Sequence, residues 1–344
     1  MTDLATGPAV APAKGSLARA EVRRFRSRRF IQVLLVLAAV GYVLAIGLAA
    51  ATTFGKTTPD QLAAAQRNIA AVVEEQNGYR EQCLNDPNRP ADIPDEMFCG
   101  PPNTDEDFPV ENFLDKQPFV LADALPAGGL AVAAAVAALS FLLGATYVGA
   151  EWSSRSMVAL LFWEPRRLKV MRVKLGVLIG AAALLGVISQ ALWWGTALIM
   201  ARTLGRTGPL PDGFYDDLLA QQGRSVLLVL FTALLGFALS NLVRNTGAAL
   251  GVGFVYFAVV ESAVRAIRDS WQEWLLTDNA VALVLQGGNR LFLQDEGFVD
   301  ESGNFVFSGR ELVLSNLHGA LVLGLVTTAL LALGVVLFQR RDLQ

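Results

Sequence analysis

The sequence predicts an all-α polytopic membrane protein with six transmembrane helices. Two observations lead to this prediction: long apolar stretches recur along the chain, and basic residues gather on one side of the resulting topology. Each stretch has about the 20 residues that a helix needs to cross a hydrocarbon core. An isolated segment can cross only as a helix, because hydrocarbon offers no partner to exposed backbone groups. The predicted spans are residues 30–51, 124–149, 175–201, 225–243, 246–263 and 317–338.

Charge predicts how these spans are oriented. Six spans place both termini on one side, which then holds 16 basic and 5 acidic residues, most of the basic ones in residues 1–29 and 150–174. The positive-inside rule assigns this side to the cytoplasm. Residues 339–344 then form a cytoplasmic tail, and residues 52–123, 202–224 and 264–316 lie outside. No soluble segment combines a basic patch with aromatic stacking residues, which argues against a nucleic-acid partner.

The cytoplasmic arm, residues 1–29, contains an amphipathic pattern from residue 16 onward. Ala18, Val22 and Phe25 share one face at helical spacing, and arginines fill the rest. Such a helix lies along an anionic inner leaflet, or it serves only to fix the topology of the first span. The two interpretations are compatible.

The residue pattern of the external segment 52–123 predicts one helix followed by a proline-rich loop. The helix covers residues 59–84, with a break or cap at Asn77-Gly78. The chain has two cysteines, Cys83 and Cys99, and both lie in this segment. On an oxidising side of the membrane they predict a disulfide worth about 3 kcal/mol, with two free thiols as the alternative. The external segment 264–316 predicts a helix over 265–276 and a hairpin over 298–307 with a turn at 300–304.

Residues with catalytic or ligand-binding potential are scarce. The single histidine, His318, is expected to be an interfacial polar residue, since two cysteines and one histidine so placed make no zinc set. The Gly55-Lys56-Thr57 sequence lacks the leading glycine and the strand of a phosphate-binding loop. Glu261 lies within the fifth span and is expected to pair with Arg265, a proton or cation relay being the alternative.

Other polar and small residues lie within the spans. A substrate path, or simply packing, could use Gln190, Trp193, Trp194, Ser240 and Asn241. Two GxxxG patterns, Gly176–Gly180 and Gly247–Gly251, favour close helix packing, more often within a six-helix bundle than with a second subunit.

The loop 150–174 is unusual because it is cytoplasmic yet holds seven consecutive apolar residues, 157–163. Seven residues cannot span a membrane. The pattern predicts a short helix at the membrane surface that ends near Glu164-Pro165, because a residue before proline avoids the α region. A rigid apolar helix at this face suits docking of a partner protein.

At this loop the chain resembles the permease subunits of ABC-2 type transporters. The matching residues are Gly149, Glu151, Ser153, Ser154, Leu160, Leu161, Pro165, Arg166, Arg167 and Lys174. The arginine-rich arm and the C-terminal Phe338-Gln-Arg-Arg-Asp-Leu resemble the family too. One departure is Arg155, where a glycine is common, and the external segment 52–123 is larger than the family minimum.

The resemblance implies a fold and a function. It implies an ABC-2 type permease fold, a coupling helix over 150–167 seated in a separate ATPase, and two permease subunits, identical or different, in a bacterial plasma membrane. ATP and Mg would bind the partner; the chain would be no enzyme and would carry no cofactor or metal. Exported substrates in the family are mostly lipids, polysaccharides, antibiotics or peptides. The implied coupling residues are Glu151, Arg155, Met157, Leu160, Leu161, Glu164, Pro165, Arg166 and Arg167.

Two other classes compete with this interpretation. A membrane sensor or envelope assembly protein could act through the disulfide-tied external segment. An intramembrane enzyme would need paired polar groups within the spans, and the sequence does not supply them.

Overall fold

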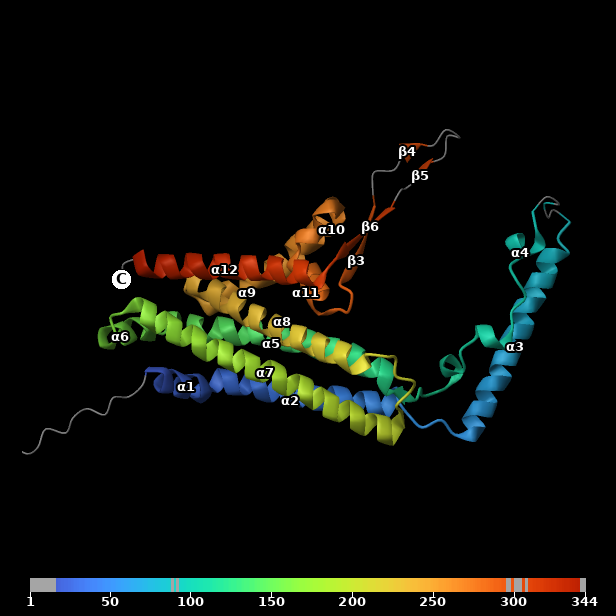
Figure 1. Cartoon of the computed structure of the whole chain (residues 1–344), viewed down its shortest axis with the longest axis horizontal. Coiled ribbons are helices and arrows are strands. Elements are labelled where there is room, and N and C mark those ends of the chain that lie inside the picture. The colour runs from blue at the N-terminus through green and yellow to red at the C-terminus, as the bar shows by residue number, and fades with distance from the viewer. Residues whose placement is uncertain are drawn as a thin grey trace, which may run out of the picture. The chain divides into compact units, whose positions relative to one another are not determined.

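A computed structural model describes residues 17–87, 90, 93–294, 298–299, 305–306 and 309–340. Six helices of this described chain are long and apolar enough to cross a membrane, which confirms the predicted fold class. They are α2 (Arg29–Thr52), α5 (Leu121–Ser153), α7 (Arg167–Leu204), α8 (Phe214–Val243), the continuous segment Thr246–Ile267, and α12 (Asn316–Arg340) (Figure 1). Helices α5 and α7 extend beyond the predicted apolar stretches because polar turns at their ends continue the helix.

The chain divides into two compact units. The described residues of the first unit fall within Met1–Ala39, Pro126–Trp193 and Gly213–Gln344, and those of the second within Val40–Leu125 and Trp194–Asp212. In the first unit, α1 (Leu17–Ser27), α6 (Ser156–Trp163) and the C-terminal end of α12 lie at one end of the helical bundle (Figure 1).

Glycines set the contact between α5 and α8. A Cβ at Gly144 would overlap the carbonyl oxygen of Ala233, and one at Gly236 would overlap that of Phe141. Ser140 Oγ donates to Val229 O at 3.0 Å across the same contact. The two backbones therefore touch directly, as small residues allow in membrane bundles.

The GxxxG prediction was wrong in placing these glycines at in-chain contacts. A Cβ added at Gly176, Gly180 or Gly251 would meet nothing within 4 Å, and at Gly247 it would meet only the side chain of Asn245. Periodicity identified the small residues but not the direction in which they face.

The fifth span is not a uniform α-helix. It consists of α9 (Thr246–Val255), the π-helical turn η3 (Tyr256–Val260) and α10 (Glu261–Ile267). The predicted helix over 265–276 was wrong in part. The chain forms the 3-10 helix η4 (Asp269–Trp274) and then α11 (Leu276–Val284), which the sequence did not predict.

Helix α11 is anchored by an apolar cluster. Its Leu283 and Val284 pack with Leu228 of α8 and Leu323 of α12. Gly319 of α12 allows this approach, because a Cβ there would overlap the carbonyl oxygen of Asn279.

A hairpin follows α11. Strand β3 (Asn289–Gln294) pairs antiparallel with β6 (Gly309–Leu314), and β4 (Phe298–Val299) pairs with β5 (Phe305–Val306). The β4–β5 pair confirms the predicted hairpin in its described part, while the predicted turn 300–304 lies outside the described residues. The longer β3–β6 ladder was not predicted.

The second unit is built on α3 (Pro59–Leu84), which matches the predicted helix. Thr58 and Gln61 form a reciprocal capping box at its start. The expected break at Asn77-Gly78 was wrong: the helix runs through it. The Asn77 side chain instead exchanges two hydrogen bonds of 2.9 Å with the backbone of Asn103.

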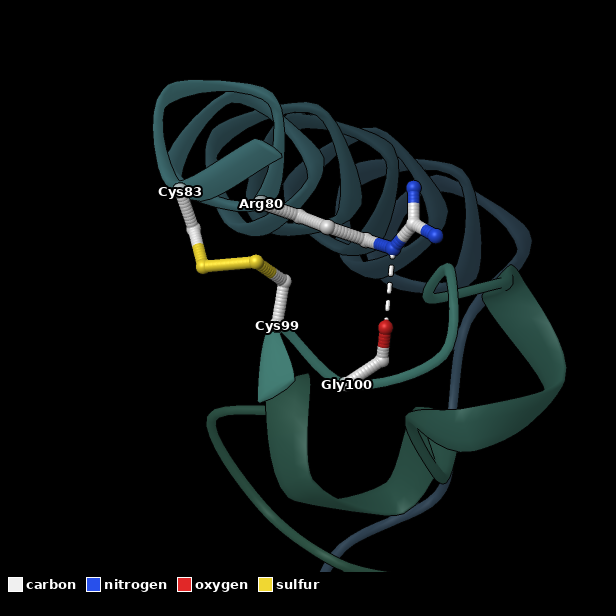
Figure 2. Close-up of a disulfide and its surroundings, with 4 residues drawn as sticks. All are labelled: Arg80, Cys83, Cys99 and Gly100. Carbon is white, nitrogen blue, oxygen red and sulfur yellow. Dashed lines mark hydrogen bonds between the residues drawn. A yellow bond between two sulfur atoms is a disulfide. The ribbon is translucent and has the colours of Figure 1, made fainter. Parts of the chain in front are cut away.

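The loop after α3 folds back along this helix. A disulfide joins Cys83 to Cys99, with Cα atoms 5.8 Å apart, and Arg80 Nε donates to Gly100 O at 2.9 Å (Figure 2). Short helical turns follow along the loop, and a parallel pair of two-residue strands lies elsewhere in the same unit. These elements are α4 (Asp95–Phe98), η1 (Asp105–Asp107), η2 (Val110–Phe113), β1 (Phe119–Val120) and β2 (Gly205–Arg206).

Candidate functional site

Helix α6 confirms the predicted short helix in the loop between the second and third spans. It has eight residues, Ser156–Trp163, and Glu164 caps its C-terminus. The reversal from α5 into α6 occurs at Arg155, whose φ of 56° is left-handed. Glycine adopts this conformation without the steric cost that a side chain carries, which explains why glycine suits this position.

The two faces of α6 differ in their surroundings. Met157 is completely buried and Leu161 is 8% exposed, and both belong to a core cluster with Tyr147, Val170 and Met171. Leu160 is half-buried against the same cluster. Because Leu161 is buried and Leu160 is half-buried, replacing them by aspartate would damage the core as well as any contact with a partner protein.

The outward end of α6 carries two aromatic residues that the sequence analysis did not single out. Phe162 is 85% exposed and Trp163 is 90% exposed. They lie in the seven-residue apolar run, but the run alone does not say which residues face outward.

A buried ionic cluster lies beside α6. Lys174 Nζ of α7 is 2.7 Å from Glu21 of α1 and 2.6 Å from Glu151 of α5. None of these three side chains is more than 1% exposed. Tyr147 of α5 donates its hydroxyl to Glu21 at 2.9 Å. We call Glu21, Glu151, Lys174 and the two arginines described next the ionic cluster.

Two arginines complete the ionic cluster. Arg24 NH1 is 2.9 Å from Glu21, and Arg28 pairs with Glu151. Arg28 also donates to Thr146 O at 3.1 Å and Tyr147 O at 2.6 Å, near the C-terminal end of α5. The cluster therefore joins α1, α5 and α7 at the end of the bundle that carries α6.

Helix α1 packs on the bundle through Leu17, Glu21 and Phe25, whereas Val22 of the predicted apolar face is 44% exposed. The position of this face along an inner leaflet stays a prediction. The ionic pairs with Lys174 and Arg28 hold Glu21 and Glu151 inward. Glu151 is 1% exposed, and its contact with an ATPase also stays a prediction.

The remaining predicted coupling residues lie just after α6. Glu164 accepts a hydrogen bond of 2.9 Å from Arg166 and one from Lys169, and these bonds hold its pKa below the usual glutamate value. Pro165 separates α6 from α7 and is exposed. Arg167 donates to the last carbonyls of α12, Phe338 O at 2.9 Å and Gln339 O at 3.0 Å. Their contact with an ATPase remains a prediction.

The first unit places its predicted substrate-path residues in two groups, Gln190 with Trp193 beside Gly129 and Ser240 with Asn241 in α8. Gln190 donates to Gly129 O at 3.2 Å, and the Trp193 ring packs on Gly128, where a Cβ would overlap it. Asn241 accepts from Trp152 Nε1 at 3.2 Å near the α6 end. Ser240 is completely buried beside it. Trp194 follows Trp193 in α7 and falls in the second unit.

The predicted Glu261–Arg265 pair is present at 3.3 Å, with Glu261 completely buried. Arg265 also pairs with Asp278 of α11 at 3.0 Å, and Thr277 N donates to Glu261 at 3.0 Å. Burial raises the pKa of Asp278 above its usual value of 3.8. The pair therefore fastens α11 to the end of the fifth span.

No group of metal-binding side chains occurs in the part of the chain that the structure describes. His318 lies at the start of α12, its ring 5.9 Å from that of Trp274, with Nε2 3.3 Å from Glu273 O.

Six candidate spans, a short helix in the loop between the second and third spans and a basic arm define a polytopic helical membrane protein. Residues 16–343 match the family model described as ABC-2 family transporter protein, and the chain belongs to this family. It is thus a transmembrane subunit of an ABC transporter and not itself the catalyst. No curated protein and no solved structure matches the chain.

Proposed function

We propose that this permease subunit is driven by a separate ATPase chain that docks on α6 through Phe162 and Trp163. The partner binds ATP and Mg, and two permease subunits together form the transport path. The substrate class is a lipid, drug-like molecule or peptide, exported across a bacterial plasma membrane. The carrying observation is the exposure of these two aromatic side chains, 85% and 90%.

An aromatic pair at the end of a rigid helix is suited to a protein partner. Aromatic side chains dominate the energy of protein interfaces where they fill a pocket. Eight residues of helix are about 12 Å long, so α6 cannot cross a bilayer. The inner face of α6 is buried in the core. A displacement of Phe162 and Trp163 by the ATPase would therefore move α6 together with the helices packed against it.

The ionic cluster connects α6 and its surroundings to the rest of the bundle, so that a movement of α6 can be transmitted. The core cluster that holds Met157 and Leu161 also contacts Leu17 and Phe25 of α1. The ionic cluster fixes α1 to α5 and α7, and α1 leads directly into α2. We infer that α6, α1 and the adjoining ends of α5 and α7 move as one block when the ATPase changes state.

The proposed orientation places both termini and α6 in the cytoplasm. It rests on the excess of basic residues on that side, 16 against 5 acidic residues. The same orientation puts Cys83 and Cys99 on the oxidising side, where a disulfide persists.

The test is co-purification of the full chain with its ATPase from native membranes in mild detergent. The variant Phe162→Asp/Trp163→Asp is expected to lose the ATPase while remaining in the membrane fraction. A matched control is Phe292→Asp/Trp271→Asp, which changes exposed aromatic residues, 75% and 57% exposed, elsewhere in the first unit. The control is expected to keep the ATPase.

Three other outcomes would each change the proposal. Retention of the ATPase by the α6 variant would remove Phe162 and Trp163 from the docking site. Absence of the variant from the membrane fraction would show that the pair is needed for folding or insertion of the chain, and not for docking alone. A wild-type chain that never brings an ATPase would favour the sensor or assembly function of the disulfide-tied external segment.

A further inference from the structure

A basic hollow lies between α7 and α12, at the end of the bundle that carries α6. It has a volume of about 650 Å³ and includes Arg166, Arg167, Lys169 and Arg172 around the start of α7, with Gln339 of α12. We call it the α7–α12 hollow. Arg166 and Arg167 are also predicted coupling residues, but the proposed docking through Phe162 and Trp163 assigns no role to Lys169 and Arg172.

The hollow has a fixed floor. Arg167 bonds the carbonyl oxygens of Phe338 and Gln339 and stacks over the Phe338 ring, with its guanidinium carbon 6.0 Å from the ring centroid. This side chain thus holds the start of α7 against the end of α12. Apart from Arg166, which lies just before α7, the lining residues belong to α7 and α12.

The charge of the hollow is positive and only partly neutralised. Glu164 pairs with Arg166 and Lys169, so four cations against one carboxylate leave a net charge of +3. Arg172 is exposed and has no ion pair among the described residues. Lys169 and Arg172 are three residues apart on α7, a spacing that puts both side chains within reach of one anion.

The depth of the hollow matches that of lipid headgroups. Helix α7 has 38 residues and is therefore about 57 Å long, well beyond a hydrocarbon core of about 30 Å. Its apolar run begins at Leu175, one turn after Arg172. Leu168 and Val173 also line the hollow and give it an apolar margin.

We propose that the α7–α12 hollow binds the phosphate group of an anionic membrane phospholipid, with Lys169 and Arg172 as the phosphate ligands. Basic pockets between membrane-spanning helices suit such headgroups. The apolar margin and the depth select a lipid over a free phosphate ion, which needs neither. A bound lipid would bridge α7 and α12 at the point where Arg167 already joins them.

The test measures lipid retention by the purified full chain, without any ATPase. The chain is delipidated, titrated with phosphatidylglycerol or phosphatidylcholine in detergent, and the retained lipids are counted by native mass spectrometry. Wild type is expected to retain phosphatidylglycerol selectively, and less of it as salt is raised. The variant Lys169→Gln/Arg172→Gln should bind it about 25-fold more weakly, since each cation near an anionic lipid contributes about a factor of five.

The control Lys56→Gln/Arg67→Gln removes two exposed cations from the other unit and should bind like wild type. Arg172→Gln alone, with an expected loss of about fivefold, serves if the double variant misfolds. Equal retention by variant and wild type would overturn the proposal, and so would equal retention of phosphatidylcholine. Displacement by inorganic phosphate at the same affinity would assign a free anion. If Lys169→Gln/Arg172→Gln retains lipid like wild type but loses the ATPase in a separate co-purification from native membranes, the hollow is assigned to a protein partner.

Discussion

Removing Lys174 is expected to destabilise the chain more than any other single change in the ionic cluster. Lys174 is completely buried, and its ammonium lies 2.7 Å from Glu21 and 2.6 Å from Glu151. In Lys174→Met a similar volume is kept, but two carboxylates that are each 1% exposed lose a shared cation. The change therefore isolates charge from packing.

The magnitude follows from what remains in the cluster. Breaking a buried ion pair by removing one partner costs about 3–5 kcal/mol. Glu21 keeps Arg24 and Glu151 keeps Arg28, so we expect the lower end of this range, about 3 kcal/mol. Glu21→Gln leaves Lys174 paired with Glu151 and should cost less, about 1.5 kcal/mol for a weakened hydrogen bond to a charged group.

The assay is the free energy of unfolding in mixed micelles, titrated with a denaturing detergent. If uncompensated carboxylates cause the loss, adding Glu21→Gln to Lys174→Met should recover part of the stability, because it removes one of them. Lys56→Met, at an exposed lysine, is the matched control and should change nothing. A loss below about 1 kcal/mol in Lys174→Met, or simple additivity in the double variant, would refute the argument.

Three further predictions concern other parts of the chain. Arg155→Gly should stabilise the chain by about 1 kcal/mol in the same assay, because glycine has no Cβ to clash in the left-handed conformation of residue 155. A loss of stability would mean that the arginine side chain makes a stabilising contact. Cys83→Ser should destabilise the loop that follows α3 by about 3 kcal/mol, seen as faster hydrogen exchange near Gly100, and unchanged exchange would show that Arg80 and Asn77 suffice to hold it. Burial raises the pKa of Asp278, so the folded state binds this proton more tightly than the unfolded chain, and the free energy of unfolding should fall as pH rises from 3.8 through the raised pKa. Measured over a pH series, wild type should show this slope and Asp278→Asn a flatter one. Equal slopes in the two proteins would assign the pH dependence to another group.

Local patterns of the sequence were sufficient for much of the fold. Hydropathy predicted all six membrane-crossing helices, helical spacing and the proline predicted α6, and the only two cysteines predicted their own disulfide. Each of these features depends on the segment itself and its solvent. The π-helical turn and α11 were missed, since both depend on packing of the fifth span against its neighbours.

The candidate site was predicted only in outline. The apolar run predicted α6, but the exposed pair Phe162 and Trp163, which we propose for docking, was identified only once the inner face was seen to be buried. The ionic cluster was missed because its members looked like ordinary topology-setting charges. A signal was present: Glu21 and Glu151 are two of only five acidic residues on a side with sixteen basic ones.

By itself, the sequence determined that this protein crosses a membrane six times, with a short apolar helix between the second and third spans. The length and apolarity of a segment are properties of the segment itself, and together with the thickness of the bilayer they decide whether it can span the membrane. Only the tertiary structure decided which charges are buried and which glycines touch a neighbour. Glu21 and Lys174 are 153 residues apart, so their pairing exists only where α1, α5 and α7 meet.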